Sequence, residues 1–381
     1  MNTMITDEQT LLHDTALRFV REQYGQRDRQ VSIDSPNGCR AAIWHQFAAL
    51  GWLGLPFPAR HGGFDGTPLD VMLLMQAFGR GLVVEPYLSS VILSGGVILS
   101  GGSEGQKERY LPPLISGGIR LASGFHEEGS GGSTAHVSTT ARPTQDGYCL
   151  DGQKSVVLGA AGADALIVSA RTQGNTRDDG GISLFLLDAR TQGVTLRPYI
   201  LIDGRHAADV TLRNVRVPSD AILGPVGQGK ALIDQAIDDA TLACVGEAVG
   251  VLERALEMTI DYLKTRQQFG QPLSAFQVLK HRVVDIYIAL EELRSLALSA
   301  ASERDPLGRS KAISAAKVHI GEGGTRAILD TIQLHGAIGM TEDYALGHYV
   351  RRFTAIDRLF GGAAEHLTRY RRSPGDAGHA A

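Results

Sequence analysis

The segment best suited to chemistry is Tyr262-Leu-Lys-Thr-Arg-Gln-Gln-Phe-Gly-Gln-Pro-Leu-Ser-Ala-Phe-Gln-Val-Leu-Lys-His. Phe269, Gly270 and Pro272 predict a turn between two helices, because glycine and proline interrupt helical chain. The turn leaves Arg266 at a helix end. A guanidinium suits a pyrophosphate because its planar fork donates two charge-assisted hydrogen bonds at once. The segment therefore predicts a phosphate-binding site, and the alternative is a surface ion pair of Arg266.

A second candidate is an isolated charge on an apolar stretch. Between Asp239 and Glu253 the chain reads Ala-Thr-Leu-Ala-Cys-Val-Gly-Glu-Ala-Val-Gly-Val-Leu, and Glu247 is the only charge in it. A carboxylate on a buried helix needs a partner or acquires a raised pKa, and both conditions recur at catalytic sites. Glu247 is therefore a candidate general base. The alternatives are a structural ion pair, a cap for another helix and a contact to a cofactor.

Other motifs are incomplete. Gly224-Pro-Val-Gly-Gln-Gly-Lys-Ala lacks the final hydroxyl that a phosphate-binding loop places on magnesium, because Ala231 stands there. His126-Glu-Glu-Gly-Ser begins like a zinc-protease motif but has Ser130 where the second histidine belongs. Four later histidines have no ligand spacing: His319, His335, His348 and His366. We expect no metal site.

The elements that would position these residues change character twice along the chain. In the first third, apolar residues such as Leu12, Ala16 and Phe19 recur at helical spacing. From near residue 120, Asp-Gly pairs at 146–147 and 151–152 indicate hairpins. Segments 165–169, 182–187 and 210–217 are typical of strands, and the last alternates as a half-buried antiparallel strand does. Because strands and helices do not alternate, the pattern disfavours a Rossmann domain here.

From Lys230 onward the sequence predicts long helices, with further runs over about 275–302 and 310–335. Long antiparallel helices with short connections favour a bundle. The predicted fold class is α+β and mostly α: an N-terminal helical domain (1–120), a middle antiparallel β domain (121–227) and a C-terminal four-helix-bundle domain (228–381).

Composition excludes several functions. The 381 residues carry 37 Lys plus Arg against 41 Asp plus Glu, which argues against a nucleic-acid binder. Three cysteines without a Cys-x-x-Cys spacing disfavour a disulfide framework and favour a reducing compartment. The start of the chain does not resemble a signal peptide, and the apolar stretch 89–102 is too short and too rich in glycine to span a bilayer. We expect a cytoplasmic protein with neither nucleic-acid nor membrane partners.

Three segments together carry a family resemblance. They are the Arg266 segment, Gln333-Leu-His-Gly-Ala-Ile-Gly-Met-Thr-Glu and Gly124-Phe-His-Glu-Glu-Gly-Ser-Gly-Gly-Ser. The chain resembles the acyl-CoA dehydrogenase superfamily over nearly its whole length, and the helical–β–helical order is that family's layout. Together with Gly347-His-Tyr-Val-Arg-Arg and Ile356-Asp-Arg-Leu-Phe-Gly, the pattern is similar to the small subunit of pimeloyl-CoA dehydrogenase and to partner subunits of bacterial steroid side-chain dehydrogenases.

The resemblance implies FAD as cofactor. It places Arg266 on the FAD pyrophosphate of a neighbouring subunit. It places further residues of the same segment against the FAD: Gln268, Phe269, Leu273 and Phe276. Residues that would approach the adenylate part from the partner chain are Gln333, Gly336 and Ala337. Phe125 and His126 would form the flavin edge, with Ser133 near the phosphates. His126 replaces the usual Thr, and Val156 and Leu158 replace the Trp and Thr that usually cover the flavin.

The chemistry that the resemblance implies is α,β-dehydrogenation of a saturated acyl thioester, in which a carboxylate removes the Cα proton. Family members carry this base at one of two places, and the residues there are Gly361 and Ala240. Glu247 lies two turns after Ala240 on the same helix face, about 10 Å along the axis. It is therefore our candidate base, with Asp238, Asp239 or a partner chain as alternatives.

The resemblance also implies partners. Electrons would pass to an electron-transfer flavoprotein, the substrate would be an acyl-CoA or an acyl carrier protein thioester, and the assembly would be a homotetramer or a heterotetramer with a related subunit. Two other functions stay open at this point. One is a catalytically silent or half-site subunit, and the other is an oxygen-using flavoenzyme of the same fold.

Overall fold

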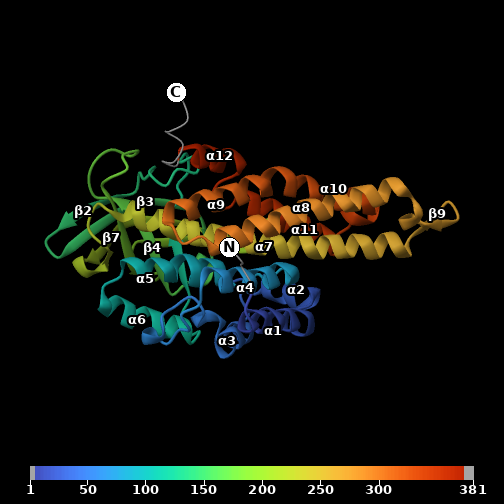
Figure 1. Ribbon diagram of the computed structural model, residues 1–381. Coiled ribbons are helices and arrows are strands. Elements are labelled where there is room, and N and C mark those ends of the chain that lie inside the picture. Colours follow the sequence, from blue (N-terminus) through green and yellow to red (C-terminus); the bar gives the residue numbers. More distant parts are fainter. Residues whose placement is uncertain (1–4, 373–381) are drawn as a thin grey trace, which may run out of the picture. The chain divides into compact units, whose positions relative to one another are not determined.

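The computed structural model describes residues 5–372, which divide into two compact units (Figure 1). Residues 30–67 and 84–240 form the sheet unit. Of the described residues, 5–29, 68–83 and 241–372 form the helical unit. Helix α7 (Gly229–Thr265) begins in the sheet unit and continues into the helical unit, whereas the short α2 (Gln26–Asp34) begins in the helical unit and ends in the sheet unit.

The sheet unit is built on one eight-stranded sheet, in which seven strands follow the order β6-β7-β3-β2-β4-β5-β8 and β1 pairs with β4. Its strands are β1 (Leu121–Gly124), β2 (Thr140–Thr144), β3 (Gly147–Leu158), β4 (Ala165–Arg171), β5 (Ile182–Asp188), β6 (Val194–Ile200), β7 (His206–Pro218) and β8 (Ile222–Leu223). The pairs are antiparallel except where β4 meets β1 and β2. Along β7 the side chains of Val210, Leu212, Val215 and Val217 are buried in the sheet's core, so the predicted alternation is present but is interrupted at the two exposed residues Arg213 and Asn214.

The first predicted hairpin is confirmed and the second is wrong. Asp146 and Gly147 lie at the turn that joins β2 to β3, whose residues pair antiparallel from Gly147 and Thr144 onward. Asp151 and Gly152 instead lie inside β3, where the register with β7 shifts between Leu150 and Gly152. An Asp-Gly pair suits a bulge as well as a turn, because both need a backbone conformation that glycine adopts easily.

Helices α3 (Ala41–Ala49), α5 (Gly96–Gly101) and α6 (Glu104–Ile115) complete the sheet unit, together with a π-helical segment at Tyr87–Gly95. In the helical unit, α7 is followed by α8 (Gln277–Ser302), α9 (Pro306–His319), α10 (Thr325–His335), α11 (Leu346–Arg358) and α12 (Ala363–Arg372). Helices α1 (Asp7–Gln23) and α4 (Pro68–Gly81) belong to the same unit. The run predicted over 310–335 is interrupted by a π-helical turn at Ile320–Gly324, where two glycines follow each other.

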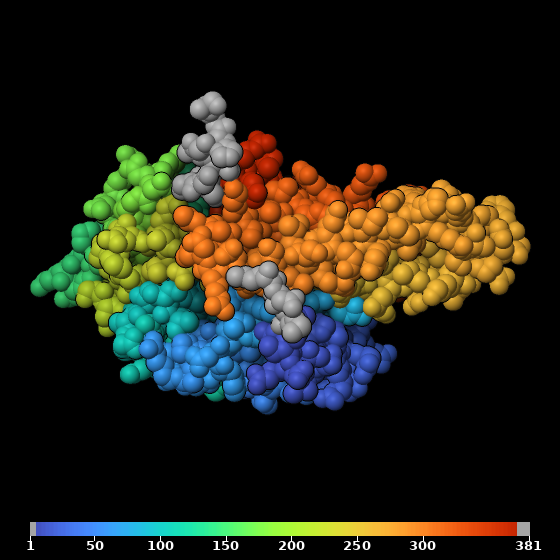
Figure 2. Space-filling model, in the orientation of Figure 1, coloured from blue at the N-terminus to red at the C-terminus, as the bar shows by residue number. Residues whose placement is uncertain are grey.

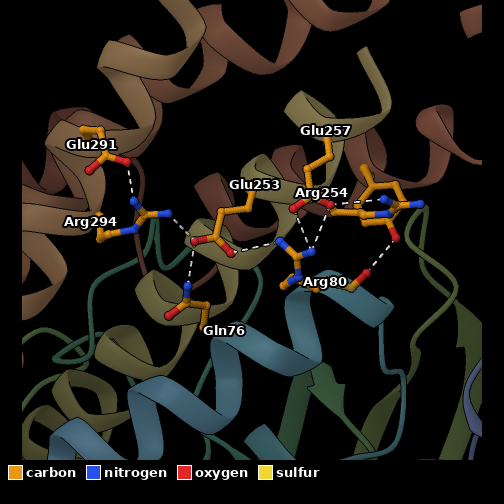
Figure 3. Close-up of polar contacts among 8 residues, drawn as sticks. Gln76, Arg80, Glu253, Arg254, Glu257, Glu291 and Arg294 are labelled. Carbon is orange, nitrogen blue, oxygen red and sulfur yellow. Dashed lines mark hydrogen bonds and ion pairs between the residues drawn. The ribbon is translucent and has the colours of Figure 1, made fainter. Parts of the chain in front are cut away.

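Glycines bring the backbones of α4 and α7 into contact. A Cβ on Gly250 would lie 1.9 Å from the Gln76 carbonyl oxygen, and one on Gly79 would lie 2.1 Å from that of Glu247. Polar side chains of α4 and α7 meet beside this crossing, as Figure 3 shows. There Glu253 accepts from Gln76 Nε2 at 2.7 Å and pairs with Arg80 Nη1 at 3.3 Å.

The same charged group continues to α8. Arg294 pairs with Glu253 at 2.5 Å and also with Glu291 on its own helix (Figure 3). Arg80 also pairs with Glu257, which lies one helical turn after Glu253 on α7, with 2.8 Å between Arg80 Nη2 and Glu257 Oε1. Glu253 is buried, and burial of a carboxylate is costly unless it is paired and hydrogen-bonded, as it is here. The network therefore joins α4, α7 and α8 through one carboxylate.

The predicted fold class is confirmed: helices come first, the sheet is in the middle and helices return. The boundaries after residues 120 and 227 stay a prediction. In the described part of the chain, no helix has both the length and the apolar character needed to cross a membrane.

Candidate cofactor and acyl-thioester site

The Arg266 segment forms a hairpin at one end of the helical bundle, drawn at the β9 label in Figure 1 and in golden orange in Figure 2. Strand β9 (Gln267–Gln268) pairs antiparallel with β10 (Gln271–Pro272). The turn residues Phe269 and Gly270 have φ values of 54° and 79°, and the Leu273 amide closes the hairpin on the Arg266 carbonyl at 2.8 Å. The predicted turn between two helices is thus present.

The Arg266 side chain is exposed, and among residues 5–372 it has no ion-pair partner. The surface ion pair that we weighed as an alternative is therefore absent within the described chain. Phe269 is 88% exposed and packs edge-on against Phe276, with 6.1 Å between the ring centroids. An exposed aromatic ring beside a cation fits a large phosphorylated cofactor with aromatic rings, so these residues suit FAD.

The second cofactor segment lies beside the first in the same chain. Gln333, Gly336 and Ala337 are exposed at the end of α10, where Gly336 has a φ of 66°. The neighbouring ring of His335 stacks on Tyr262, four residues before Arg266, with 4.5 Å between the centroids. One chain thus presents both segments at the same end of the bundle.

His335 is held in one orientation. Its Nδ1 lies 2.8 Å from the Thr331 carbonyl, so this nitrogen carries the proton and donates it. Its Nε2 then accepts from the Tyr344 hydroxyl at 3.2 Å. Burial lowers the pKa of His335, which keeps the ring neutral. The stack therefore fixes the spacing between the Arg266 hairpin and the Gln333–Ala337 loop.

The third segment belongs to the sheet unit. Phe125 is buried directly after β1, whereas His126 and Ser133 are exposed. The Ser155 amide of β3 donates to the His126 carbonyl at 2.9 Å, which ties this segment to the strand. Val156 follows with a φ of 54° and is 42% exposed. An exposed backbone edge with an apolar side chain beside it fits one face of an isoalloxazine ring.

Glu247 lies in a buried ion pair. Arg352 donates from Nε to Oε1 at 2.7 Å and from Nη2 to Oε2 at 2.5 Å. The side chains are 0% and 3% exposed, respectively. A carboxylate with both oxygens bound to a guanidinium favours its charged form and is a weak proton acceptor. The geometry therefore supports the first alternative, a structural ion pair. The base role of Glu247 stays a prediction without structural support.

The structure also describes the two positions that the resemblance assigns to the base, Ala240 and Gly361. Ala240 is fully buried on α7. Gly361 follows α11 with a φ of 102°, and the preceding Phe360 has a φ of 60°. Lys317 ends α11 by donating to the carbonyls of Ile356, Asp357 and Leu359 at 2.6, 3.0 and 2.9 Å. Burial lowers the pKa of Lys317 to about 8.

His366 holds the other side of this loop. Its Nε2 donates to the Phe360 carbonyl at 3.1 Å, and its Nδ1 accepts from Ser314 at 3.2 Å. Burial, followed by the nearby Lys317 charge, lowers the pKa of His366 to about 4. The loop that contains Gly361 is therefore fixed by two buried side chains although it carries no acid.

Sequence reasoning missed a buried carboxylate near Leu158. Glu85 lines a pocket of the sheet unit together with Leu158, Gly159 and His206. It is 3% exposed and accepts from the Ser32 hydroxyl at 2.7 Å. No sequence signal marked it, because the residues around it read only as a break between helices.

Comparisons with known proteins cover nearly the whole chain. Family models for the N-terminal, middle and C-terminal domains of acyl-CoA dehydrogenase match residues 6–118, 122–215 and 227–370. The human mitochondrial short-chain specific acyl-CoA dehydrogenase is 31% identical over 90% of this chain and 86% of its own length. Subunit CarC of the caffeyl-CoA reductase-Etf complex from Acetobacterium woodii is 31% identical over 81% of this chain and 83% of its own.

Solved structures agree. A steroid ACAD variant, Tcur3481-Tcur3483, superposes with a TM-score of 0.85 at 30% identity over 97% of this chain and 98% of that chain. The FAD complex of PigA gives a TM-score of 0.90 at 25% identity, with 98% of each chain covered. The ChsE4-ChsE5 complex from Mycobacterium tuberculosis gives 0.88 at 25% identity, again over 98% of each chain.

Proposed function

The chain belongs to the acyl-CoA dehydrogenase family, and on that premise we propose that it oxidises a saturated acyl thioester to the enoyl thioester with FAD. The observation that carries the proposal is the Arg266 hairpin, a cation without an ion-pair partner among residues 5–372 beside the exposed ring of Phe269. Arg266 and the Gln333–Ala337 loop would hold the phosphates and adenylate. Phe125, His126 and Ser133 would hold the flavin end, with Gln268, Leu273 and Phe276 supporting the hairpin.

Bound FAD would supply the acceptor for the hydride that leaves Cβ as the proton leaves Cα. The family relation to an Etf-complex subunit supports an electron-transfer flavoprotein as the electron acceptor. The residues of this chain bind and orient the reactants. They do not offer an evident proton acceptor at the two base positions, Gly361 and Ala240.

Because neither of these two positions carries a proton acceptor, a second candidate function is a half-site subunit whose base comes from a related chain. The ion pair between Glu247 and Arg352 supports it, because our first candidate for the base in this chain is already engaged by a guanidinium. Structural similarity to the ChsE4-ChsE5 complex and to Tcur3481-Tcur3483 supports assembly with a second chain. Both candidates share the fold and the cofactor and differ in where the base lies.

Anaerobic flavin reduction separates the two candidates. The chain is purified alone and together with a related subunit, and the flavin absorbance is followed after a panel of acyl-CoA and acyl carrier protein thioesters is added. Bleaching of the flavin in the chain alone supports a complete enzyme, and bleaching only in the mixture supports the half-site subunit. Bound flavin that no thioester bleaches in either preparation contradicts both candidates. Oxygen consumption with substrate would identify an oxygen-using enzyme.

We also expect at least a dimer, and most simply a tetramer. Three apolar side chains of α8 share one face: Val284, Tyr287 and Ile288 are 52%, 53% and 49% exposed. Such a face on a bundle helix suits burial against a second copy or a related chain. Sedimentation should therefore give a mass well above that of one 40.7-kDa chain.

A double substitution tests the face itself. Val284→Glu with Ile288→Glu should shift the assembly toward smaller species, because two charges would be buried in the contact. Leu11→Glu, at another exposed apolar residue (68%), is the control and should not change the mass. A 41-kDa particle that retains FAD at micromolar concentration would rule out a cofactor shared between chains.

A further inference from the structure

We propose that Glu127 and Lys154 are positioning residues that hold the His126 segment in the shape that receives the flavin. The proposal rests on the FAD function above and concerns residues that sequence analysis did not single out. The two side chains are 2% and 0% exposed, and 2.5 Å separates Glu127 Oε1 from Lys154 Nζ. Both belong to the sheet unit.

Glu127 accepts hydrogen bonds from several segments of the chain. The amides of Ser138 and Thr139 donate to it at 2.6 and 3.1 Å, and the hydroxyls of the same two residues donate as well. Lys154 donates in addition to Ser169 of β4 at 2.9 Å. The pair therefore connects the segment after β1 to the chain that enters β2, to β3 and to β4.

The charges of the pair are stable near neutral pH. Burial by itself would raise the pKa of Glu127, but the charge of Lys154 and the hydrogen bonds lower it to about 2. Burial lowers the pKa of Lys154 to about 8, against the opposing effect of Glu127. Both groups are thus mainly ionised at pH 7, and removal of one would leave a buried charge uncompensated.

The pair lies next to the residues proposed to touch the flavin. Glu127 follows His126 directly, and Lys154 precedes Ser155, whose amide donates to the His126 carbonyl at 2.9 Å. The register of β3 with β7 shifts between Lys154 and Val157, which turns Val156 outward with a φ of 54°. The ion pair therefore lies buried beneath the backbone that exposes His126 and Val156.

The remainder of the segment is held mainly by local hydrogen bonds, such as the one between the Ser130 hydroxyl and His126 Nδ1 at 3.0 Å, and it is rich in glycine. Gly129, Gly131 and Gly132 have φ values of 79°, 58° and 83°, and a Cβ on any of them would meet nothing within 4 Å. Glycines in open space leave the backbone many conformations once it is released. Glu127 is the buried anchor directly beside His126, so its loss should affect cofactor binding more than a loss of stability alone would.

Two variants and a matched control test this. Glu127→Gln and Lys154→Met each break the pair, and Leu187→Ala opens a cavity in the core of the same sheet. FAD affinity is measured by titrating apoprotein at a temperature where all three are folded, together with the visible spectrum of the bound flavin. We expect roughly ten-fold weaker binding or more and a shifted spectrum in the pair variants, and nearly wild-type values in Leu187→Ala. Wild-type affinity and spectrum in both pair variants would overturn the proposal.

Hydrogen exchange of the apoprotein gives a readout that does not need FAD. The amides of Ser138 and Thr139, which donate to Glu127, should exchange faster in Glu127→Gln than in Leu187→Ala. If wild-type protein fails to bind FAD, the proposed function fails, yet this comparison still decides the positioning role. Unchanged exchange in both pair variants would refute that role even if the protein is a flavoenzyme.

Discussion

Arg266→Ala is expected to weaken FAD binding by roughly ten- to one-hundred-fold. Charge-assisted hydrogen bonds contribute about 1.5–3 kcal/mol, and Arg266 makes no ion pair among residues 5–372 that would compete with the cofactor phosphates. The variant should purify with much less flavin, and its assembly should weaken because the cofactor would be shared between subunits. Flavin content and a titration of the apoprotein measure the effect.

Arg304→Ala is the control for Arg266→Ala. Arg304 is also exposed, but it follows the other end of α8. A general effect of lost positive charge would appear in both variants, whereas loss of a phosphate contact appears only at Arg266. Equal FAD affinity in the two variants would remove Arg266 from the cofactor site.

Glu247→Gln is expected to destabilise the protein by about 3–5 kcal/mol, because it removes the carboxylate charge that pairs with the buried Arg352 guanidinium. Arg352→Met should lower the stability by a similar amount, because it removes the guanidinium charge that pairs with the buried Glu247 carboxylate. The pair joins α7 to α11, so both should lower the denaturant concentration at which the helical unit unfolds. Denaturation followed by circular dichroism measures the change.

The double variant Glu247→Met with Arg352→Met removes both charges and should be more stable than either single variant. The Glu247→Gln variant also tests whether Glu247 is the catalytic base. Normal stability in Glu247→Gln, combined with a ~10²–10⁴-fold slower flavin reduction, would restore Glu247 as the base. Lost stability with wild-type reduction of the remaining folded flavoprotein would assign it a structural role.

The sequence predicted features that depend on neighbouring residues. The turn after Arg266 follows from Phe269, Gly270 and Pro272, and the strand at 210–217 follows from alternation, because both are decided locally. Asp151 and Gly152 show the limit of local signals. The same pair can form a turn or a bulge, and the neighbouring strand β7 decides between them.

Partners distant in the sequence could not be predicted. Glu247 was recognised as a charge that needs a partner, yet Arg352 lies 105 positions away and only the packing of α11 on α7 brings it there. Lys154 was less visible still, since a lysine within a strand normally points to solvent. Its burial depends on Glu127, which lies 27 positions earlier in the sequence and outside the strand.

The loop around Gly361 bears on whether the missing acid could be regained in evolution. Gly361 has a φ of 102°, a conformation that costs any residue with a Cβ, and Phe360 before it is also left-handed. Lys317 and His366 hold the carbonyls on either side of this turn. A single codon change to glutamate would therefore meet a backbone of the wrong shape. Gain of a base at this position would therefore require the turn to change together with the residue, so a base supplied by a partner chain would need fewer changes in this one.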